Sequence, residues 1–202
     1  LLTAFEPYGE WAENSSWLTL IELLKARPSS VELLTRRYPV DLGALQSRLA
    51  EDLEKKPDVV LHLGQSPGAA AIKPEAVALN VAGCVDENGQ ELPPLVDAGT
   101  LAFHSTMPLG RWADMLRQAG IPAIVSYHAG TFLCNATMYL THHWCQVNRH
   151  PIQVGFVDLV LATEHRVGRQ RKMYKAHLNW ITIDLAPMVR KVPVSYTHLR
   201  AH

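Results

Sequence analysis

The segment from residue 128 to 135, HAGTFLCN, places a cysteine where a helix is expected to begin. A predicted strand ends just before it, a glycine turn follows, and Cys134 falls in the first turn of the predicted helix. The N–H groups at a helix N-terminus are unpaired and carry partial positive charge, which stabilises a thiolate and can hold an oxyanion. Cys134 is therefore a candidate nucleophile. The alternative is a small buried hydrophobic residue, as most free cysteines are.

A glutamate and two aromatic residues are the next candidates. Glu75 immediately precedes an apolar run, and a carboxylate that enters such a strand is costly unless it is paired. The alternative is an exposed carboxylate at the end of a strand. Phe5 and Tyr8 lie in a loop predicted to follow the first strand, where they would wall a small apolar pocket or simply cover the core.

Histidines are numerous, so their number identifies no catalytic base. His128 and His165 lie nearest to the loops that could carry a site. His142 and His143 lie two turns or more along the helix predicted after Cys134, too far along it to be natural partners of the thiol.

Short apolar runs alternate with helical patterns along the chain, and these elements must position the candidate residues. Asn14 is a plausible N-cap for the first helix, and leucines recur every four residues in Leu42–Lys56. The alternation predicts an α/β fold with a mostly parallel sheet, whose sites lie beyond the carboxyl ends of the strands. The predicted strands are Leu1–Phe5, Val31–Val40, Val59–Gly64, Ala76–Ala82, Ile121–Ser126 and Gln153–Leu161, and further helices are predicted near Trp112–Gly120, Thr131–Val147 and Ile181–Val192.

The composition bounds the class of protein. A chain of 202 residues suits one domain, and 19 basic residues balance 19 acidic ones, which gives no support for a nucleic-acid partner. The three cysteines, Cys84, Cys134 and Cys145, form a poor disulfide framework and favour a reducing compartment. No apolar run approaches the roughly 20 residues that span a bilayer. There is no P-loop and no GxGxxG motif.

Both ends of the chain carry unusual sequence. The chain opens without a methionine, and Leu1–Phe5 reads as the end of a strand whose beginning lies upstream. The last nine residues, VSYTHLRAH, read as translated vector sequence, with a frayed native tail as the alternative. We therefore expect one domain over residues 1–193, with a truncated N-terminus, and a non-native tail over residues 194–202.

Several segments, in the correct order, resemble the pyroglutamyl-peptidase I family of cysteine peptidases. They include LLTAFEPYG, LGQSPGAAAIKPEAVALNV and GIPAIVSYHAGTFLCNATMY, and the resemblance runs from Leu1 to about Val160. It implies a three-layer α/β/α sandwich and a cytoplasmic omega-peptidase that removes N-terminal pyroglutamate from peptides through a thioester. It implies no metal or organic cofactor, no membrane partner and a possible homo-oligomer, a tetramer in many members.

The resemblance assigns roles to individual residues. By motif, Cys134 is the nucleophile and Glu75 is the carboxylate of a Cys–His–Glu triad. The residues that would bind the lactam ring of the substrate are Phe5, Tyr8, Gln65, Phe132 and Leu133, with Tyr8 in place of a phenylalanine. Pyroglutamate is a compact neutral lactam, so an apolar pocket with a few aimed hydrogen bonds suits it.

One departure from the family concerns catalysis directly. Gly155-Phe156-Val157 is followed by Asp158, where the family has its histidine, and the family's arginine after the asparagine of its central segment is also missing. An aspartate forms no ion pair with the thiolate, and as an anion it raises the pKa of the thiol. We expect Asp158 and Glu75 to face each other and to share a proton.

Three hypotheses follow from this departure. The first is an active peptidase that uses His128 or His165 as a substitute base. The second is a family member with little or no hydrolysis that at most binds pyroglutamyl peptides. The third is an altered sequence of an active enzyme, since one base change converts histidine to aspartate.

Overall fold

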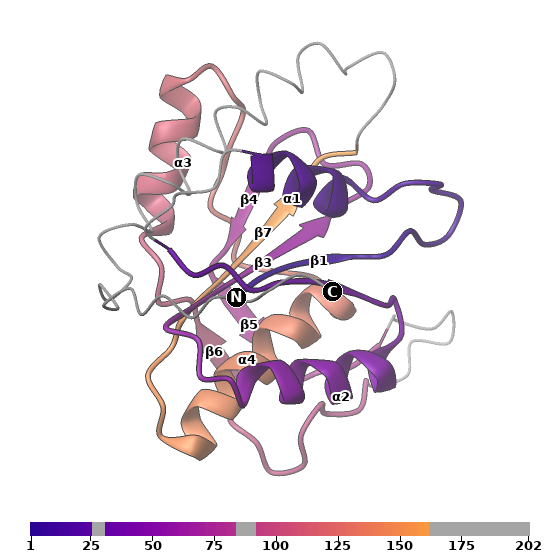
Figure 1. Ribbon diagram of the computed structural model, residues 1–202, viewed down its shortest axis with the longest axis vertical. Coiled ribbons are helices and arrows are strands. Elements are labelled where there is room, and N and C mark those ends of the chain that lie inside the picture. The colour runs from indigo at the N-terminus through magenta and orange to yellow at the C-terminus, as the bar shows by residue number, and fades with distance from the viewer. Residues whose placement is uncertain (26–30, 84–91, 162–202) are drawn as a thin grey trace, which may run out of the picture.

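A five-stranded sheet forms the centre of the molecule (Figure 1), in a computed structural model that describes residues 1–25, 31–83 and 92–161. The strand order is β2-β1-β3-β7-β4, and only β4 runs antiparallel to its neighbour. The mostly parallel sheet predicted from the sequence is confirmed. The strands are β1 (Leu2–Phe5), β2 (Thr35–Tyr38), β3 (Val59–Gln65), β4 (Lys73–Glu75) and β7 (Gln153–Leu159).

Among the described residues, two helices cover each face of this sheet, which gives the three layers expected for an α/β/α sandwich (Figure 1). The helices α1 (Ser15–Lys25) and α3 (Leu109–Gln118) pack on one face. The helices α2 (Leu42–Leu53) and α4 (Leu133–Asn148) pack on the other. Side chains on β1 alternate accordingly, because successive residues of a strand point to opposite faces: Leu2 and Ala4 join the first core, and Phe5 joins the second.

The order of the strands creates a crevice at one edge of the sheet. From β1 the chain passes through α1 to β2 on one side, and then through α2 to β3 on the other side of β1. The direction in which successive strands are added to the sheet therefore reverses between the parallel strands β1 and β3, and ligands of such sheets bind beyond the strand ends at that point. Phe5 ends β1 and Gln65 ends β3, so both lie at this crevice.

Side-chain caps explain where two of the helices begin. The Asn14 side chain accepts a hydrogen bond from the N–H of Ser16 at 3.0 Å, as expected for the predicted N-cap of α1. Asp41 accepts from the N–H of Ala44 at 2.8 Å and caps α2.

Three predicted strands differ from the observed structure, and one of them, predicted over residues 31–40, shortens to β2. Residues 121–126 form no regular strand and pair only through the isolated bridges Ile72↔Ala123 and Glu75↔Ser126. The strand predicted over residues 76–82 shortens to β5 (Val77–Leu79), which pairs antiparallel with β6 (Ala102–His104) in a separate sheet. The chain leaves the main sheet at Ala76, whose carbonyl accepts from Ser105 rather than from β7.

Several sequence-based expectations fall outside the described residues. They are the candidate substitute base His165, the cysteine Cys84, the predicted helix Ile181–Val192 and the tail 194–202. Within the described ranges, no helix has the length and apolar character that crossing a bilayer requires.

Candidate active site

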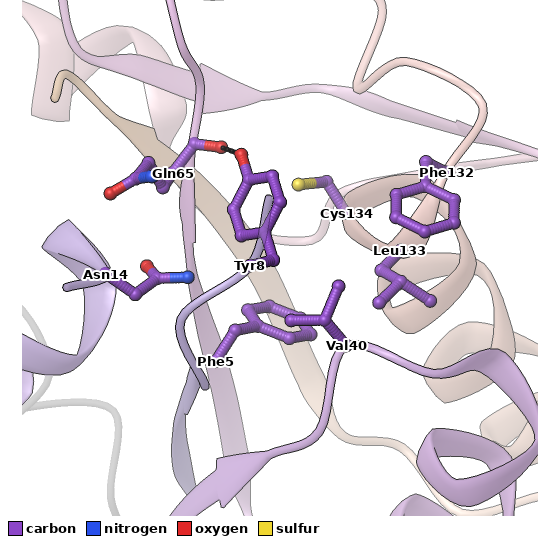
Figure 2. A pocket seen from close by; sticks show the side chains of 8 residues that line it. All are labelled: Phe5, Tyr8, Asn14, Val40, Gln65, Phe132, Leu133 and Cys134. Carbon is purple, nitrogen blue, oxygen red and sulfur yellow. Dashed lines mark hydrogen bonds between the residues drawn. The ribbon is translucent and has the colours of Figure 1, made fainter. Parts of the chain in front are cut away.

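A small pocket opens at the crevice between β1 and β3 (Figure 2). It contains about 340 Å³ of empty space, part of it open to solvent, and its lining is mostly apolar. The five residues that the family resemblance assigned to the lactam pocket all line it, together with the candidate nucleophile. The lining residues are Phe5, Tyr8, Asn14, Val40, Gln65, Phe132, Leu133 and Cys134.

Gln65 brings one polar group with unused bonding capacity to this pocket. Its side-chain oxygen accepts from the backbone N–H of Ser15 at 2.7 Å and from the Ser15 hydroxyl at 2.9 Å. The amide nitrogen of Gln65 is buried and has no hydrogen-bond partner among the described residues. The Tyr8 hydroxyl donates to the Gln65 carbonyl at 3.3 Å, which holds the Tyr8 ring over the pocket (Figure 2). The Gln65 amide is therefore anchored on α1 at the wall of the pocket, and its buried donor is unused within the described part of the chain.

Cys134 lies in the first turn of α4, as predicted. Gly130 makes the preceding turn with a φ of +75°, a left-handed conformation that favours glycine. The helix starts at Leu133, and the N–H of Ala136 donates to the Phe132 carbonyl at 2.9 Å. Its first N–H groups therefore have no intrahelical partner and point toward the end where the sulfur lies. Cys134 is partly exposed at the pocket, and Figure 2 shows its sulfur pointing toward Tyr8.

The sulfur of Cys134 contacts a carboxylate. Its Sγ donates a hydrogen bond to Oδ1 of Asp158 at 3.3 Å. Asp158 lies near the end of β7, and its cross-strand neighbour on β4 is Lys73. Glu75, two residues further along β4, lies on the same face of the sheet as Asp158. Sequence reasoning left open whether the Glu75 carboxylate is exposed at the end of a strand, and the structure buries it completely.

These groups shift one another's acidity. Burial first, and then the nearby Asp158 carboxylate, raise the pKa of Glu75 to about 7, against the opposing effects of the Ser126 hydroxyl and the Lys73 ammonium. Burial also raises the pKa of Asp158 to about 6. The pKa of the Cys134 thiol lies well above its ordinary value because of burial first and then the negative charge of Asp158. Near neutral pH the site therefore holds a protonated thiol beside two carboxyl groups whose raised pKa values favour their protonated forms.

Glu75 is incompletely satisfied. Neither of its carboxylate oxygens makes a well-formed hydrogen bond with a described residue, although the Ser126 hydroxyl and the Asp158 carboxyl lie near enough to affect its pKa. A buried carboxyl group without partners is costly, and groups of this kind gather at functional sites.

Gly64 makes room for Asp158, which together with Glu75 we call the acidic pair. It is the cross-strand neighbour of Asp158, and a Cβ atom at position 64 would lie 2.5 Å from Oδ1 of Asp158 and 2.6 Å from the Phe156 ring. Any larger residue there would displace the carboxylate from its place beside the sulfur.

No described imidazole contacts the sulfur. His128, one of the two substitute bases suggested by the sequence, is exposed, and its Nδ1 accepts from the N–H of Gly130 at 2.9 Å. Asp158 is the partner of Cys134 Sγ among the described residues. Within those residues, no three His, Cys, Asp or Glu side chains are grouped so as to hold a metal ion.

Sequence reasoning missed four contributors to this region. Asn14 and Val40 line the pocket, Gly64 gives clearance and Lys73 lies opposite Asp158. Val40 follows β2, so the rule that sites lie beyond strand ends could have identified it. Lys73 carried no such signal, because its position depends on the antiparallel pairing of β4 with β7.

Comparison with known proteins gives consistent results. A family model described as pyroglutamyl peptidase matches residues 1–184. A pyrrolidone-carboxylate peptidase of Clavibacter michiganensis is 33% identical over 205 residues, which cover 99% of this chain and 95% of that protein. A pyrrolidone-carboxylate peptidase of Pyrococcus furiosus is 32% identical over 174 residues, which cover 84% of each chain.

Solved structures agree with the sequence matches. The crystal structure of a pyrrolidone carboxyl peptidase from Fervidobacterium islandicum superposes with a TM-score of 0.77 at 30% identity and covers 92% of this chain and 97% of that one. The enzyme of the same name from Thermococcus litoralis superposes with a TM-score of 0.73 at 25% identity and covers 96% and 98% of the two chains.

Proposed function

Because the chain belongs to the pyroglutamyl peptidase family of cysteine peptidases, we propose that it acts on the N-terminal pyroglutamyl residue of peptides. The observation that carries the proposal is the apolar pocket with Cys134 at its rim. A neutral five-membered lactam offers apolar ring carbons and one amide group, and this pocket offers a mostly apolar wall with Tyr8, Asn14 and Gln65 as its polar lining residues. No acidic anchor is required, because pyroglutamate has no charged amine.

Cys134 is the proposed nucleophile. Its sulfur attacks the pyroglutamyl carbonyl carbon, a C–S bond forms, and the thiol proton passes to Asp158. The oxyanion that develops lies near the unpaired N–H groups at the start of α4. As the C–N bond breaks, the acidic pair returns a proton to the departing amine. Water then attacks the thioester, releases pyroglutamate and restores the thiol.

Asp158 makes this series of reaction steps slow in the present chain. The family's imidazole would form an ion pair with the thiolate, whereas a carboxylate repels it. The pKa of Asp158, about 6, is also far below that of the raised thiol, so proton transfer from sulfur to carboxylate is uphill. We therefore propose that Cys134, Glu75 and Asp158 form the reaction centre and that hydrolysis is strongly impaired.

A second function follows from the same geometry. The lactam pocket is complete without a competent base, because its lining includes neither Asp158 nor Glu75. A member of the family that binds pyroglutamyl peptides and releases them unchanged would have this arrangement.

Further properties are proposed on the family resemblance. We propose one domain over residues 1–193 and a cytoplasmic location, which two free cysteines in the described chain support. A homo-oligomer, no metal or organic cofactor and no nucleic-acid partner complete the proposal, and the balanced charge supports the last of these.

The decisive test is turnover of a pyroglutamyl chromogenic amide by the wild-type chain, Asp158→His and Cys134→Ala. We expect weak wild-type turnover, a large gain for Asp158→His and none for Cys134→Ala. Binding of a pyroglutamyl peptide to all three, measured by calorimetry, separates the binding function from hydrolysis. Vigorous wild-type turnover would refute the role given to Asp158.

A further inference from the structure

A chain of buried hydrogen bonds runs beneath the active site from the sheet to helix α4. The Thr3 hydroxyl lies 2.7 Å from Nδ1 of His62, and Nε2 of His62 lies 2.9 Å from the Thr141 hydroxyl. Thr141 donates to the Thr137 carbonyl at 2.8 Å, and Thr137 donates to the Leu133 carbonyl at 2.6 Å. The four polar side chains are fully buried. We call these five residues the His62 chain.

The direction of each bond follows from the donors available. Thr141 donates its single hydroxyl proton to the Thr137 carbonyl, so it can only accept a hydrogen bond from His62. His62 therefore carries its proton on Nε2, and its Nδ1 accepts from the Thr3 hydroxyl. Burial holds the pKa of His62 at about 3, so the ring is neutral and this tautomer is fixed at ordinary pH. Every hydrogen bond of the series is therefore donated in the direction from the sheet toward Leu133, the residue that precedes the nucleophile.

The spacing along α4 connects this chain with the reaction centre. Thr141 lies seven residues after Cys134, which is close to two helical turns, so both side chains lie on the same face of α4. That face looks toward the sheet, where one residue contacts His62 and the other contacts Asp158. A rotation of α4 that broke the first contact would move the sulfur away from the second.

His62 also touches the strand that carries Asp158. Its ring packs on Phe156 with the ring centroids 6.0 Å apart, and Phe156 is its cross-strand neighbour on β7. Phe156 lies two residues before Asp158 on the same face. One imidazole therefore contacts both structural supports of the thiol–carboxyl pair.

We propose that His62 is a positioning residue for the reaction: its bond to Thr141 sets the rotation of α4 so that the sulfur of Cys134 meets residue 158. The inference rests on the proposed role of Cys134 as nucleophile. Neither the pocket nor the acidic pair includes His62, and it acts only through the helix and the strand that it joins.

Two substitutions of His62 separate its two hydrogen bonds. In His62→Gln the side-chain amide reaches the place of Nε2 and can still donate to Thr141, whereas in His62→Asn the shorter amide reaches only the Thr3 side. Thr141→Val keeps the volume of the partner and removes its hydroxyl. Thr19→Val is the matched control, because the Thr19 hydroxyl on α1 is buried and has no partner among the described residues.

The experiment measures the alkylation rate of Cys134 by iodoacetamide against pH, read by mass spectrometry on the peptide that contains it, at temperatures where each variant is folded. A loosened α4 hydrates the sulfur and separates it from Asp158, and both changes lower the thiol pKa. We expect His62→Asn and Thr141→Val to lower the midpoint by about one pH unit, a tenfold gain in thiolate at fixed pH. His62→Gln and Thr19→Val should keep the wild-type midpoint.

A second arm uses turnover in the Asp158→His background, where His62→Asn and Thr141→Val should lower kcat and His62→Gln should largely retain it. If Asp158→His has no turnover, the proposed function fails while the alkylation profile still decides the role of His62. An unchanged midpoint in His62→Asn and Thr141→Val would overturn the inference, and so would a shift in His62→Gln as large as that in His62→Asn.

Discussion

Two buried polar regions lie on one face of the sheet, and they differ in how their polar atoms are satisfied. In the His62 chain, both ring nitrogens of His62 and each threonine hydroxyl have a partner within 2.9 Å. In the acidic pair above it, both oxygens of Glu75 lack a well-formed bond among the described residues, and Asp158 faces a thiol. Buried polar groups with complete hydrogen bonds stabilise one structure. Buried ionisable groups without them have shifted pKa values, which are common at functional sites.

The two regions also respond to pH with opposite sign. Glu75 and Asp158 have raised folded pKa values, so the folded state binds more protons than the unfolded state and loses stability as pH rises through them. His62 has a lowered folded pKa, so the folded state binds fewer protons and loses stability as pH falls below the ordinary histidine value. The following experiments test this contrast.

The largest effect is expected from Asp158→His. This change replaces a carboxylate that repels the thiolate with an imidazole that can accept the thiol proton and form an ion pair with the thiolate. General acid–base groups contribute about 10²–10⁴-fold to rates, and we expect a gain of that order in kcat for a pyroglutamyl amide. Cys145→Ala is the matched control for Cys134→Ala, because Cys145 lies near the end of α4 and should be dispensable. A gain of less than threefold would mean that Asp158 does not limit turnover.

Glu75→Gln tests the cost of the unsatisfied carboxyl. With a folded pKa of about 7 against an ordinary value of 4.5, Glu75 destabilises the fold by about 3 kcal/mol at pH 8. The neutral amide has no charge to desolvate, so the unfolding free energy at pH 8 should rise by up to that amount. Urea unfolding measures it, and the gain should vanish near pH 4. An equal gain at both pH values would mean that packing, not ionisation, explains the effect.

Gly64→Ala tests the boundary between the two regions. The added methyl would overlap the Asp158 carboxylate and the Phe156 ring, so we expect a loss of about 1–3 kcal/mol in unfolding free energy. The thiol pKa should fall as the carboxylate moves away from the sulfur. Gly110→Ala, with open space around its Cβ position, is the control and should cost nothing from steric overlap. An unchanged unfolding free energy in Gly64→Ala would show that β3 and Asp158 can move apart enough to accommodate the methyl group.

The smallest effect concerns the acid limb of stability. At pH 5.5, one unit below the ordinary histidine value, an unprotonated buried His62 costs the fold about 1.4 kcal/mol relative to pH 8. His62→Gln removes this titration and should flatten the acid limb by that amount. The exposed His128→Gln should leave the limb unchanged. An unaltered limb in His62→Gln would show that other groups dominate acid unfolding.

Local sequence signals predicted the elements that carry the site. Short apolar runs predicted β1, β3 and β7 within a few residues, and the spacing of the leucines predicted α2. Strand prediction over residues 121–126 was wrong because the segment is apolar enough for a strand but pairs only at two isolated positions. Apolar content reports burial, whereas regular pairing depends on a partner elsewhere in the chain.

Predictions for individual site residues divide along the same line. The positions of Phe5, Tyr8 and Gln65 follow from strand ends, which a sequence can mark. The burial of Glu75 could not be read locally, because the residue lies next to polar and apolar neighbours alike. Its burial results from β4 pairing with β7 on one side and with Ser126 on the other.

By itself the sequence determined that a cysteine lies in the first turn of a helix after a glycine turn, and that an aspartate follows Gly155-Phe156-Val157. Both are properties of contiguous residues, where backbone geometry and side-chain type act over a few positions. Only the tertiary structure decided that this aspartate meets the sulfur and that a histidine 72 residues before Cys134 supports the same helix. Strand register and helix rotation bring these side chains together, and both are set by contacts between distant parts of the chain.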